Sequence, residues 1–191
     1  GNFMSGTLVP ALKSVDNSAV TAVASARGLS AKDLATKIGA QTASSDYGAL
    51  ISDSNIDLVI AATQHDLASK IAIDSLVANK AVHVEKPLAT TLDALHEVAE
   101  AAKSSSAVLN VGFNRRFAPL VLELEKHFSN RTTPLSMFYR VNAGWIDADH
   151  WVHDPVKGGG RIIGEVCHFI DLLQHLSGSK PTRVFATALI P

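Results

Sequence analysis

The chain has 191 residues, of which 47% are hydrophobic and 18% are charged, so it can bury a sizeable core and has room for one domain and part of another. Its formal net charge of −1 gives no electrostatic case for binding nucleic acid or an anionic membrane surface. The single cysteine, Cys167, excludes an internal disulfide framework, and no apolar run approaches the roughly 20 residues of a membrane span, so we expect a cytoplasmic protein without nucleic-acid or membrane partners.

Strand and helix patterns alternate through the first half of the sequence, which is typical of βαβ units and a parallel sheet. The expected strands are short apolar segments at 19–24, around 41, and at 58–62, 81–84 and 108–112. The expected helices lie between them, at 4–12, 30–39, 46–51, 67–77 and 92–102. Ser30 and Asp66 are candidate N-caps of two of these helices.

The second half of the sequence has a different pattern, and we place the domain boundary between residues 116 and 117. The expected elements are a helix at 119–128, a strand of another sheet at 135–141, a helix at 163–176 and a last strand at 183–189. A loop rich in Gly, Asp, His and Trp spans residues 142–160. Loops of this length inside a compact domain are usually functional or disordered.

The most informative segment runs from Ala81 to Leu88, where a buried strand ends in Glu85, Lys86 and Pro87. Open α/β sheets bind their ligands at the carboxyl ends of the strands. A lysine at this place carries a proton that its surroundings can make transferable. Glu85 either holds the lysine by charge or points to the other side of the strand, and a plain surface ion pair is the alternative interpretation.

Three further segments could contact a dinucleotide. Gly1–Phe3 precedes a helix and is either the end of a phosphate-binding glycine loop or a ragged terminus. Ser25 and Arg27 follow the second strand and suit a ribose 2′-phosphate better than two free hydroxyls, although Arg27 could equally be a solvated loop residue. Thr63 and His65 follow a buried strand, so they are either ligand-binding residues or part of a helix cap.

The glycine run 158–160 leads into an apolar helix that carries Glu165, His168 and Asp171. Glu165 and His168 are three residues apart and share a face of this helix. His168 is therefore either a satisfied core histidine or part of a polar pocket. His150 and His153 could join His168 around zinc, but their spacing matches no familiar ligand pattern, so we expect no metal site.

Three ordered motifs carry a resemblance that extends over nearly the whole chain. The segments Val84–Leu88, Asn110–Phe117 and Gly158–Leu172 resemble those of the glucose–fructose oxidoreductase/inositol dehydrogenase (Gfo/Idh/MocA) family. Trp145–Asp171 is especially similar to a subgroup in which this module follows a zinc-type alcohol dehydrogenase module. The family's first strand and leading loop glycine have no counterpart in the sequence, so we expect a truncated form of such a protein.

The resemblance implies an α/β fold with a Rossmann-like parallel sheet that lacks its first strand. Part of an α+β domain with an open, mainly antiparallel sheet would follow, and homodimers would form through that sheet. It also implies hydride transfer between NADP or NAD and a hydroxyl carbon of a sugar, cyclitol or similar polyol.

The resemblance also assigns roles to individual residues. Lys86 matches the lysine that assists proton transfer and His168 its acid/base partner, while Glu165 follows the usual place of an aspartate, which is Gly164 here. The implied cofactor-binding residues are Gly1, Asn2, Phe3, Ser25, Arg27, Thr63, His65, Glu85, Lys86 and Asn114. The glycine at position 164 leaves open an alternative function, a ligand-sensing or assembly module that keeps the fold without the chemistry.

Overall fold

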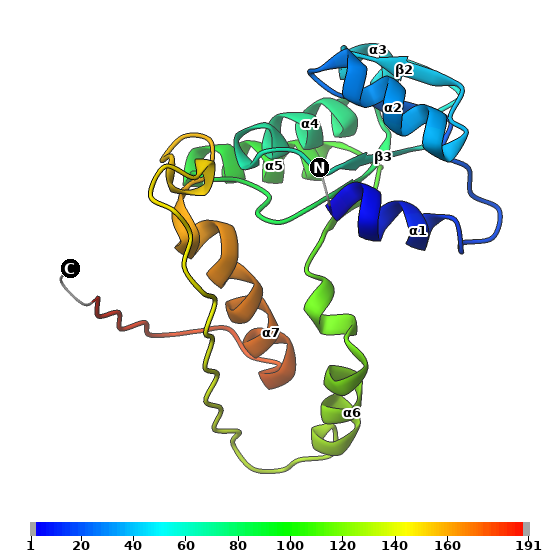
Figure 1. Cartoon of the computed structure of the whole chain (residues 1–191). Coiled ribbons are helices and arrows are strands. Elements are labelled where there is room, and N and C mark those ends of the chain that lie inside the picture. Colours follow the sequence, from blue (N-terminus) through cyan, green and yellow to red (C-terminus); the bar gives the residue numbers. More distant parts are fainter. Residues whose placement is uncertain (1–2, 189–191) are drawn as a thin grey trace.

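The computed structural model describes residues 3–188, and its first half alternates helices and strands as predicted (Figure 1). The strands are β1 (Ala22–Ala24), β2 (Thr42–Ser44), β3 (Leu58–Ala61), β4 (Ala81–Val84) and β5 (Leu109–Val111). The helices are α1 (Val9–Leu12, continuing a π-helical turn at Met4–Leu8), α2 (Gly28–Ile38), α3 (Tyr47–Ile51), α4 (His65–Val77) and α5 (Leu92–Ser104).

Both N-caps predicted from the sequence are wrong. Helix α2 begins two residues before Ser30, because the Arg27 carbonyl already accepts a hydrogen bond from the Ser30 amide, and Arg27 is the N-cap. Helix α4 begins at His65 with Gln64 as its N-cap, so Asp66 lies in the first turn. A first-turn carboxylate still stabilises the helix through its dipole, which explains why Asp66 resembles a cap in the sequence.

All strand pairs are parallel, and they form two separate sheets, β1–β2 and β3–β4–β5. In a complete Rossmann sheet the first strand joins these two groups. The division therefore falls where the resemblance expects the first strand. Because parallel strands end at the same edge, the residues that follow β3, β4 and β5 are brought together there.

The hydrophobic core lies between the three-stranded sheet and helices α4 and α5. Its fully buried members include Val82 and Val84 on β4, Leu76 on α4 and Val98 on α5. Side chains alternate across a strand, so His83 on β4 points to the face opposite this core. Because one face of β4 is buried in this way, the directions of the side chains at its carboxyl end are fixed as well.

The second half contains α6 (Pro119–Phe128), as predicted, and a helix that starts as a π-helical turn at Ile162–Val166 and continues as α7 (Cys167–Ser177). The strands predicted at 135–141 and 183–189 are wrong over the described residues, which form no strand after β5. Alternating side chains make a strand only where a neighbour accepts its backbone hydrogen bonds, and none is present in this part of the chain. The open antiparallel sheet is therefore not formed between 117 and 188. Pairing of two copies through it, and the boundary at 116/117, stay predictions.

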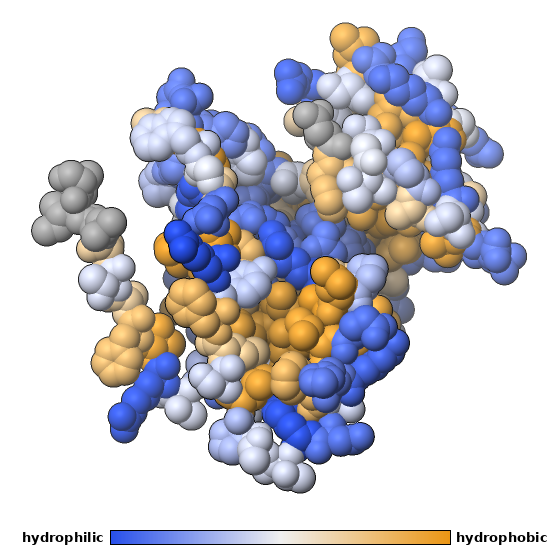
Figure 2. All heavy atoms as spheres, turned by 60° about the horizontal axis from the view of Figure 1, so that its bottom comes forward, coloured by the Kyte–Doolittle hydropathy of each residue, from blue (hydrophilic) through white to orange (hydrophobic). Residues whose placement is uncertain are grey.

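Many large apolar side chains of the second half are consequently exposed. Figure 2 shows them gathered on the face that its view brings forward. Leu120 on α6, Phe138 on the extended segment (residues 134–147, without helix or strand) and Ile170 on α7 are 80%, 89% and 46% exposed. Between residues 3 and 188, no helix is both long enough and apolar enough to span a bilayer.

Substitution Leu76→Ala tests the core. Leu76 is 1% exposed, so its truncation removes buried methyl groups and leaves a cavity that we expect to lower the free energy of unfolding by about 2–5 kcal/mol. Leu92→Ala on α5 is the matched control, because Leu92 is 72% exposed, and a change within about 0.5 kcal/mol is expected. Equal losses in urea unfolding would contradict the position of the core.

Candidate functional site

Lys86, at the carboxyl end of β4, connects the two halves of the chain. Its Nζ donates hydrogen bonds to the Gly164 carbonyl oxygen at 2.7 Å and to Glu165 Oε2 at 3.0 Å. The Lys86 side chain is only 18% exposed. The lysine that the sequence singles out therefore pairs with a carboxylate 79 residues away, from the start of the helix that carries His168.

Glu165 lies between two cations. Burial raises the pKa of its carboxyl group, but the hydrogen bond and the charge of Lys86 outweigh that effect, and the net pKa is lowered. The second cation is Arg115, whose Nη2 lies 3.5 Å from Glu165 Oε1. Glu165 is thus held as an anion at the junction of the halves.

Arg115 is a site residue that the sequence interpretation missed. Its guanidinium carbon lies 4.8 Å from the centre of the Phe169 ring, and its buried Nε has no hydrogen-bond partner among the described residues. The adjacent arginines after β5, at positions 115 and 116, were the available signal, because charged side chains at the end of a parallel strand point towards the ligand edge.

His168 lies within the same cluster, 6% exposed. Burial lowers the pKa of its imidazole, and the positive charges of Lys86 and Arg115 lower it further. Its buried Nδ1 has no hydrogen-bond partner in the described part of the chain. The lowered pKa favours the neutral imidazole, and its unpartnered ring nitrogen could accept a proton.

His65, at the start of α4, contacts the protein rather than open solvent. Its Nδ1 lies 2.7 Å from the Gly158 carbonyl oxygen, which can only accept, so Nδ1 carries the hydrogen. Trp151 packs edge-on at 4.9 Å between ring centroids. Burial lowers the pKa of His65, even though the Gly158 bond acts in the other direction.

Glu85 takes the second of the two orientations considered for it. Its Oε1 lies 3.2 Å from His83 Nε2, and its carboxylate lies so close to Gly112 that a Cβ there would be 2.8 Å away. His83 Nδ1 lies 2.8 Å from Asn110 Oδ1 on β5. Because both ring nitrogens face acceptors, the hydrogen bond to Glu85 raises the pKa of His83 despite the opposing effect of burial.

Among the described residues, none of the remaining predicted cofactor residues makes a hydrogen bond or ion pair with Lys86, Glu165 or His168. Gly1 and Asn2 fall outside the described residues, and Phe3 is 40% exposed before the first helical turn. Three others sit just past β1, β3 and β5 with exposed side chains: Arg27, Thr63 and Asn114. Ser25 is half-buried after β1. Their contact with a cofactor stays a prediction.

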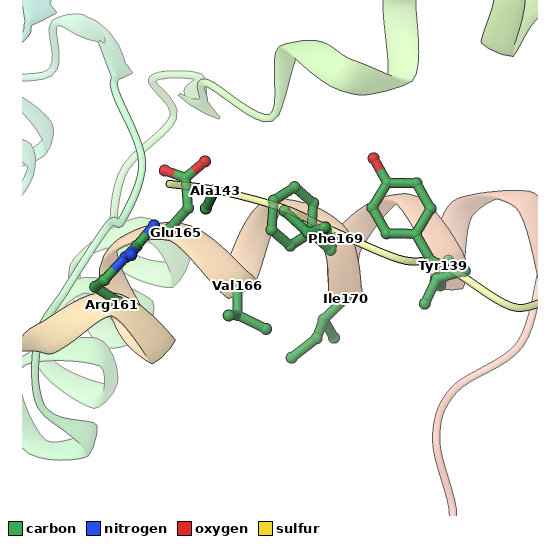
Figure 3. A pocket seen from close by; sticks show the side chains of 9 residues that line it. Tyr139, Ala143, Arg161, Glu165, Val166, Phe169 and Ile170 are labelled. Carbon is green, nitrogen blue, oxygen red and sulfur yellow. The ribbon is translucent and has the colours of Figure 1, made fainter. Parts of the chain in front are cut away.

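A cavity of about 380 Å³ lies between α7 and the extended segment that runs beside it (Figure 3). Glu165 and Arg161 stand at one end, and the other lining residues are Tyr139, Val141, Ala143, Val166, Phe169, Ile170 and Leu173. Neither Lys86 nor His168 lines it. Between residues 3 and 188, no group of three or more His, Cys, Asp or Glu side chains could hold a metal ion.

A second ion pair joins the halves next to the cluster. Arg116 Nε donates to Asp171 Oδ2 at 2.7 Å, and its Nη2 also contacts Asp171 Oδ1. Asp171 is 9% exposed and Arg116 37%. The bidentate geometry fixes the orientation of α7 relative to the end of β5.

Known proteins resemble this chain in sequence and in fold. The profile of the Gfo/Idh/MocA group, described as an oxidoreductase family with an NAD-binding Rossmann fold, matches residues 1–113. The chain is 27% identical to myo-inositol 2-dehydrogenase of Thermotoga maritima over 176 residues, which are 92% of the chain and 52% of that protein. It is 34% identical to inositol 2-dehydrogenase 2 of Saccharopolyspora erythraea over 157 residues, 80% of the chain and 43% of the relative.

Among solved structures, an oxidoreductase domain protein from Kribbella flavida matches with a TM-score of 0.80 and 25% identity, over 93% of the chain and 51% of its own. The chain spans about half the length of the curated relatives it matches. These matches confirm the α/β, Rossmann-like fold class predicted from the sequence. They lend no support to a preceding zinc-type alcohol dehydrogenase module.

Substitution Arg116→Ala tests the second ion pair. It leaves the nearly buried Asp171 carboxylate without its partner, and we expect the free energy of unfolding to fall by about 1–3 kcal/mol. Arg116→Lys keeps the charge but not the bidentate geometry and is expected to lose less. Lys103→Ala, which breaks a pair that is 71% exposed on both sides, serves as the control with no measurable change.

Substitution His83→Gln tests the charged histidine on β4. The folded-state pKa of His83 lies above its ordinary value of 6.5, so its stabilisation is complete below that pH and is lost as the pH rises through the folded-state pKa. The stability difference between wild type and variant should be larger at about pH 5.5 than at about pH 8.5. The difference between proteins is needed because His65 and His168 have lowered pKa values and act with the opposite sign. A difference that grows towards high pH would contradict the assignment.

Proposed function

We propose that this chain, which belongs to the Gfo/Idh/MocA oxidoreductase family with its NAD-binding Rossmann fold, is an NAD(P)-dependent oxidoreductase module. Its substrate would be a hydroxyl of a sugar, cyclitol or similar polyol, and the inositol dehydrogenases among its relatives support that class. The observation that carries the proposal is the cluster at the end of β4. There a partly buried ammonium, a carboxylate and an imidazole with a lowered pKa lie close together.

The residues at the carboxyl edge of the strands fit a dinucleotide. Arg27 offers an exposed guanidinium after β1, and Thr63 an exposed hydroxyl after β3, which suit phosphate and ribose groups. Glu85 fits less well, because its carboxylate is engaged by His83 on the other side of the strand. The fit supports a cofactor held along this edge, with Ser25 and Arg27 favouring NADP over NAD.

The proton chemistry would be divided between two residues. A bound oxidised nicotinamide supplies the hydride acceptor. His168 accepts the substrate hydroxyl proton at its unpartnered Nδ1, because its lowered pKa keeps it neutral. Lys86 stabilises the oxyanion: an ammonium has three donors, and two of them are used by Gly164 and Glu165.

Glu165 is the anionic partner of this pair. Its anion holds Lys86 in place and offsets part of the positive charge near His168. We propose Lys86, His168 and Glu165 as the catalytic set, acting in the cytoplasm on a small molecule.

A second candidate function is a sensing or assembly module without chemistry. It is favoured by the glycine at position 164 and by the engagement of Lys86 by two protein oxygens. Calorimetric titration with NADH and NADPH distinguishes the two. Tight binding without oxidation of any polyol favours sensing, and no binding to the folded chain favours assembly.

Substitution Lys86→Met tests the catalytic proposal. Removal of positioned proton chemistry should reduce turnover of polyols about 10²–10⁴-fold, with cofactor affinity largely kept. Turnover is followed by the absorbance of the reduced nicotinamide, with myo-inositol and levoglucosan among the substrates. Lys32→Met, at an exposed position of α2, is the control. Wild-type turnover in Lys86→Met would remove the lysine from the mechanism.

Substitution Arg27→Ala tests the cofactor preference. Loss of a charge-assisted contact with the 2′-phosphate should weaken NADPH binding about 10- to 100-fold and leave NADH binding nearly unchanged. Both affinities are measured by calorimetry on wild type and variant. Equal loss for both cofactors would assign Arg27 to a general electrostatic role.

A further inference from the structure

We propose that His65 is a positioning residue that clamps the segment 158–165 against the end of β4 and thereby places the Lys86–Glu165 pair. The Lys86–Glu165 pair matters for catalysis only if the proposed function is correct, and in that respect the inference rests on the proposed function. The contacts of His65 can, however, be tested without measuring turnover. His65 would therefore serve the site through the protein backbone, in addition to any contact with a cofactor.

The clamp begins with a single directed hydrogen bond. Only the tautomer with hydrogen on Nδ1 can donate to the Gly158 carbonyl oxygen at 2.7 Å, across 93 residues of sequence. Burial lowers the pKa of His65 against the opposing effect of the Gly158 bond, so the neutral ring that donates this bond is the tautomer with hydrogen on Nδ1. Trp151, packed against the ring edge, comes from the same long loop as Gly158.

The loop around Gly158 is itself held by further backbone contacts. The backbone amides of Gly158 and Gly159 both donate to the Asp154 carbonyl oxygen, at 2.9 and 3.0 Å. A Cβ at position 158 would lie 2.3 Å from the Val152 carbonyl oxygen, so only glycine allows this close approach. Holding the Gly158 carbonyl therefore holds the whole turn.

The same ring also touches the backbone that binds Lys86. A Cβ at Gly164 would lie 2.8 Å from His65 Cε1, and the Gly164 carbonyl accepts the 2.7 Å hydrogen bond from Lys86 Nζ. The imidazole thus occupies the space into which a side chain at position 164 would project. The carboxylate that meets Lys86 comes from the next residue, Glu165.

Three substitutions at position 65 separate the clamp from simple packing. His65→Asn keeps an amide donor near the position of Nδ1, His65→Gln moves the donor to the position of Nε2, and His65→Ala removes it. We expect amide exchange of Gly158 and Gly159 to accelerate about tenfold in the Ala and Gln variants and to return towards wild type in the Asn variant. Amides of α5 around Val98, remote from the clamp, should be unchanged.

The carboxyl pKa of Glu165, measured by carbon-13 NMR, reports the Lys86–Glu165 pair directly. In wild type it is held low by Lys86. It should rise towards the ordinary value in His65→Ala and stay low in His65→Asn. An unchanged Glu165 pKa in His65→Ala would overturn the proposal, and so would a nitrogen-15 spectrum of wild type that places the ring hydrogen on Nε2.

Substitution Gly164→Ala tests the steric contact between position 164 and the His65 ring. We expect it to disturb the Glu165 pKa in wild type, where the new methyl group meets the ring, and to have little effect on it in a His65→Ala background. Equal effects in both backgrounds would show that the ring does not occupy the space at position 164. None of these readouts depends on turnover, so failure of the catalytic proposal would be seen separately.

Discussion

The hydrogen bonds of Lys86 are the interaction on which the rest of the site depends. The lysine follows a strand whose core-facing residues, Val82 and Val84, are fully buried. The packing of these residues fixes the backbone position from which the Lys86 side chain extends. Its ammonium then reaches the Gly164 carbonyl and the Glu165 carboxylate on the other half of the chain. A partly buried cation needs such partners, because its desolvation would otherwise cost more than the fold can offset. The Arg116–Asp171 pair adds a second, orienting contact between the same two halves.

The positive charge of Lys86 favours different charge states in two neighbouring groups, Glu165 and His168. The positive charge of Lys86 lowers the pKa of both Glu165 and His168, but with opposite results. For the carboxyl group it favours the anion, and for the imidazole it favours the neutral base. The partly buried ammonium of Lys86 therefore favours an anion that holds it and, together with the burial of His168, a neutral base beside it. This separation of protonation states is what acid–base chemistry on a hydroxyl requires near neutral pH.

Local sequence signals predicted the elements that local interactions determine. Strand β4 and helix α6 have the predicted bounds, since each is delimited by its own turn or proline residues. The strand expected at 135–141 failed because a strand depends on a distant partner that alternation alone cannot reveal. Lys86 and His168 could be chosen from motif and position, whereas the partners of Lys86 could not. Glu85 was the carboxylate considered for holding Lys86 by charge, but the alternation of side chains across β4 turns it towards His83, and Glu165 pairs with the lysine instead. Arg115 was missed because its role arises from a contact with a helix 50 residues away.

The position of the acid shows how the fold constrains the chemistry. A lysine has a flexible four-carbon stem, so Lys86 can reach a carboxylate from position 165. A side chain at position 164 has less room, because its Cβ would lie 2.8 Å from His65 Cε1 and 3.6 Å from the Gly158 carbonyl oxygen. Gly164 and Glu165 both lie in the π-helical turn at Ile162–Val166, and such turns are frequent at functional sites. An aspartate at position 164 would require the His65 ring to move or a smaller residue at position 65. Steric exclusion, rather than charge, therefore links these two positions.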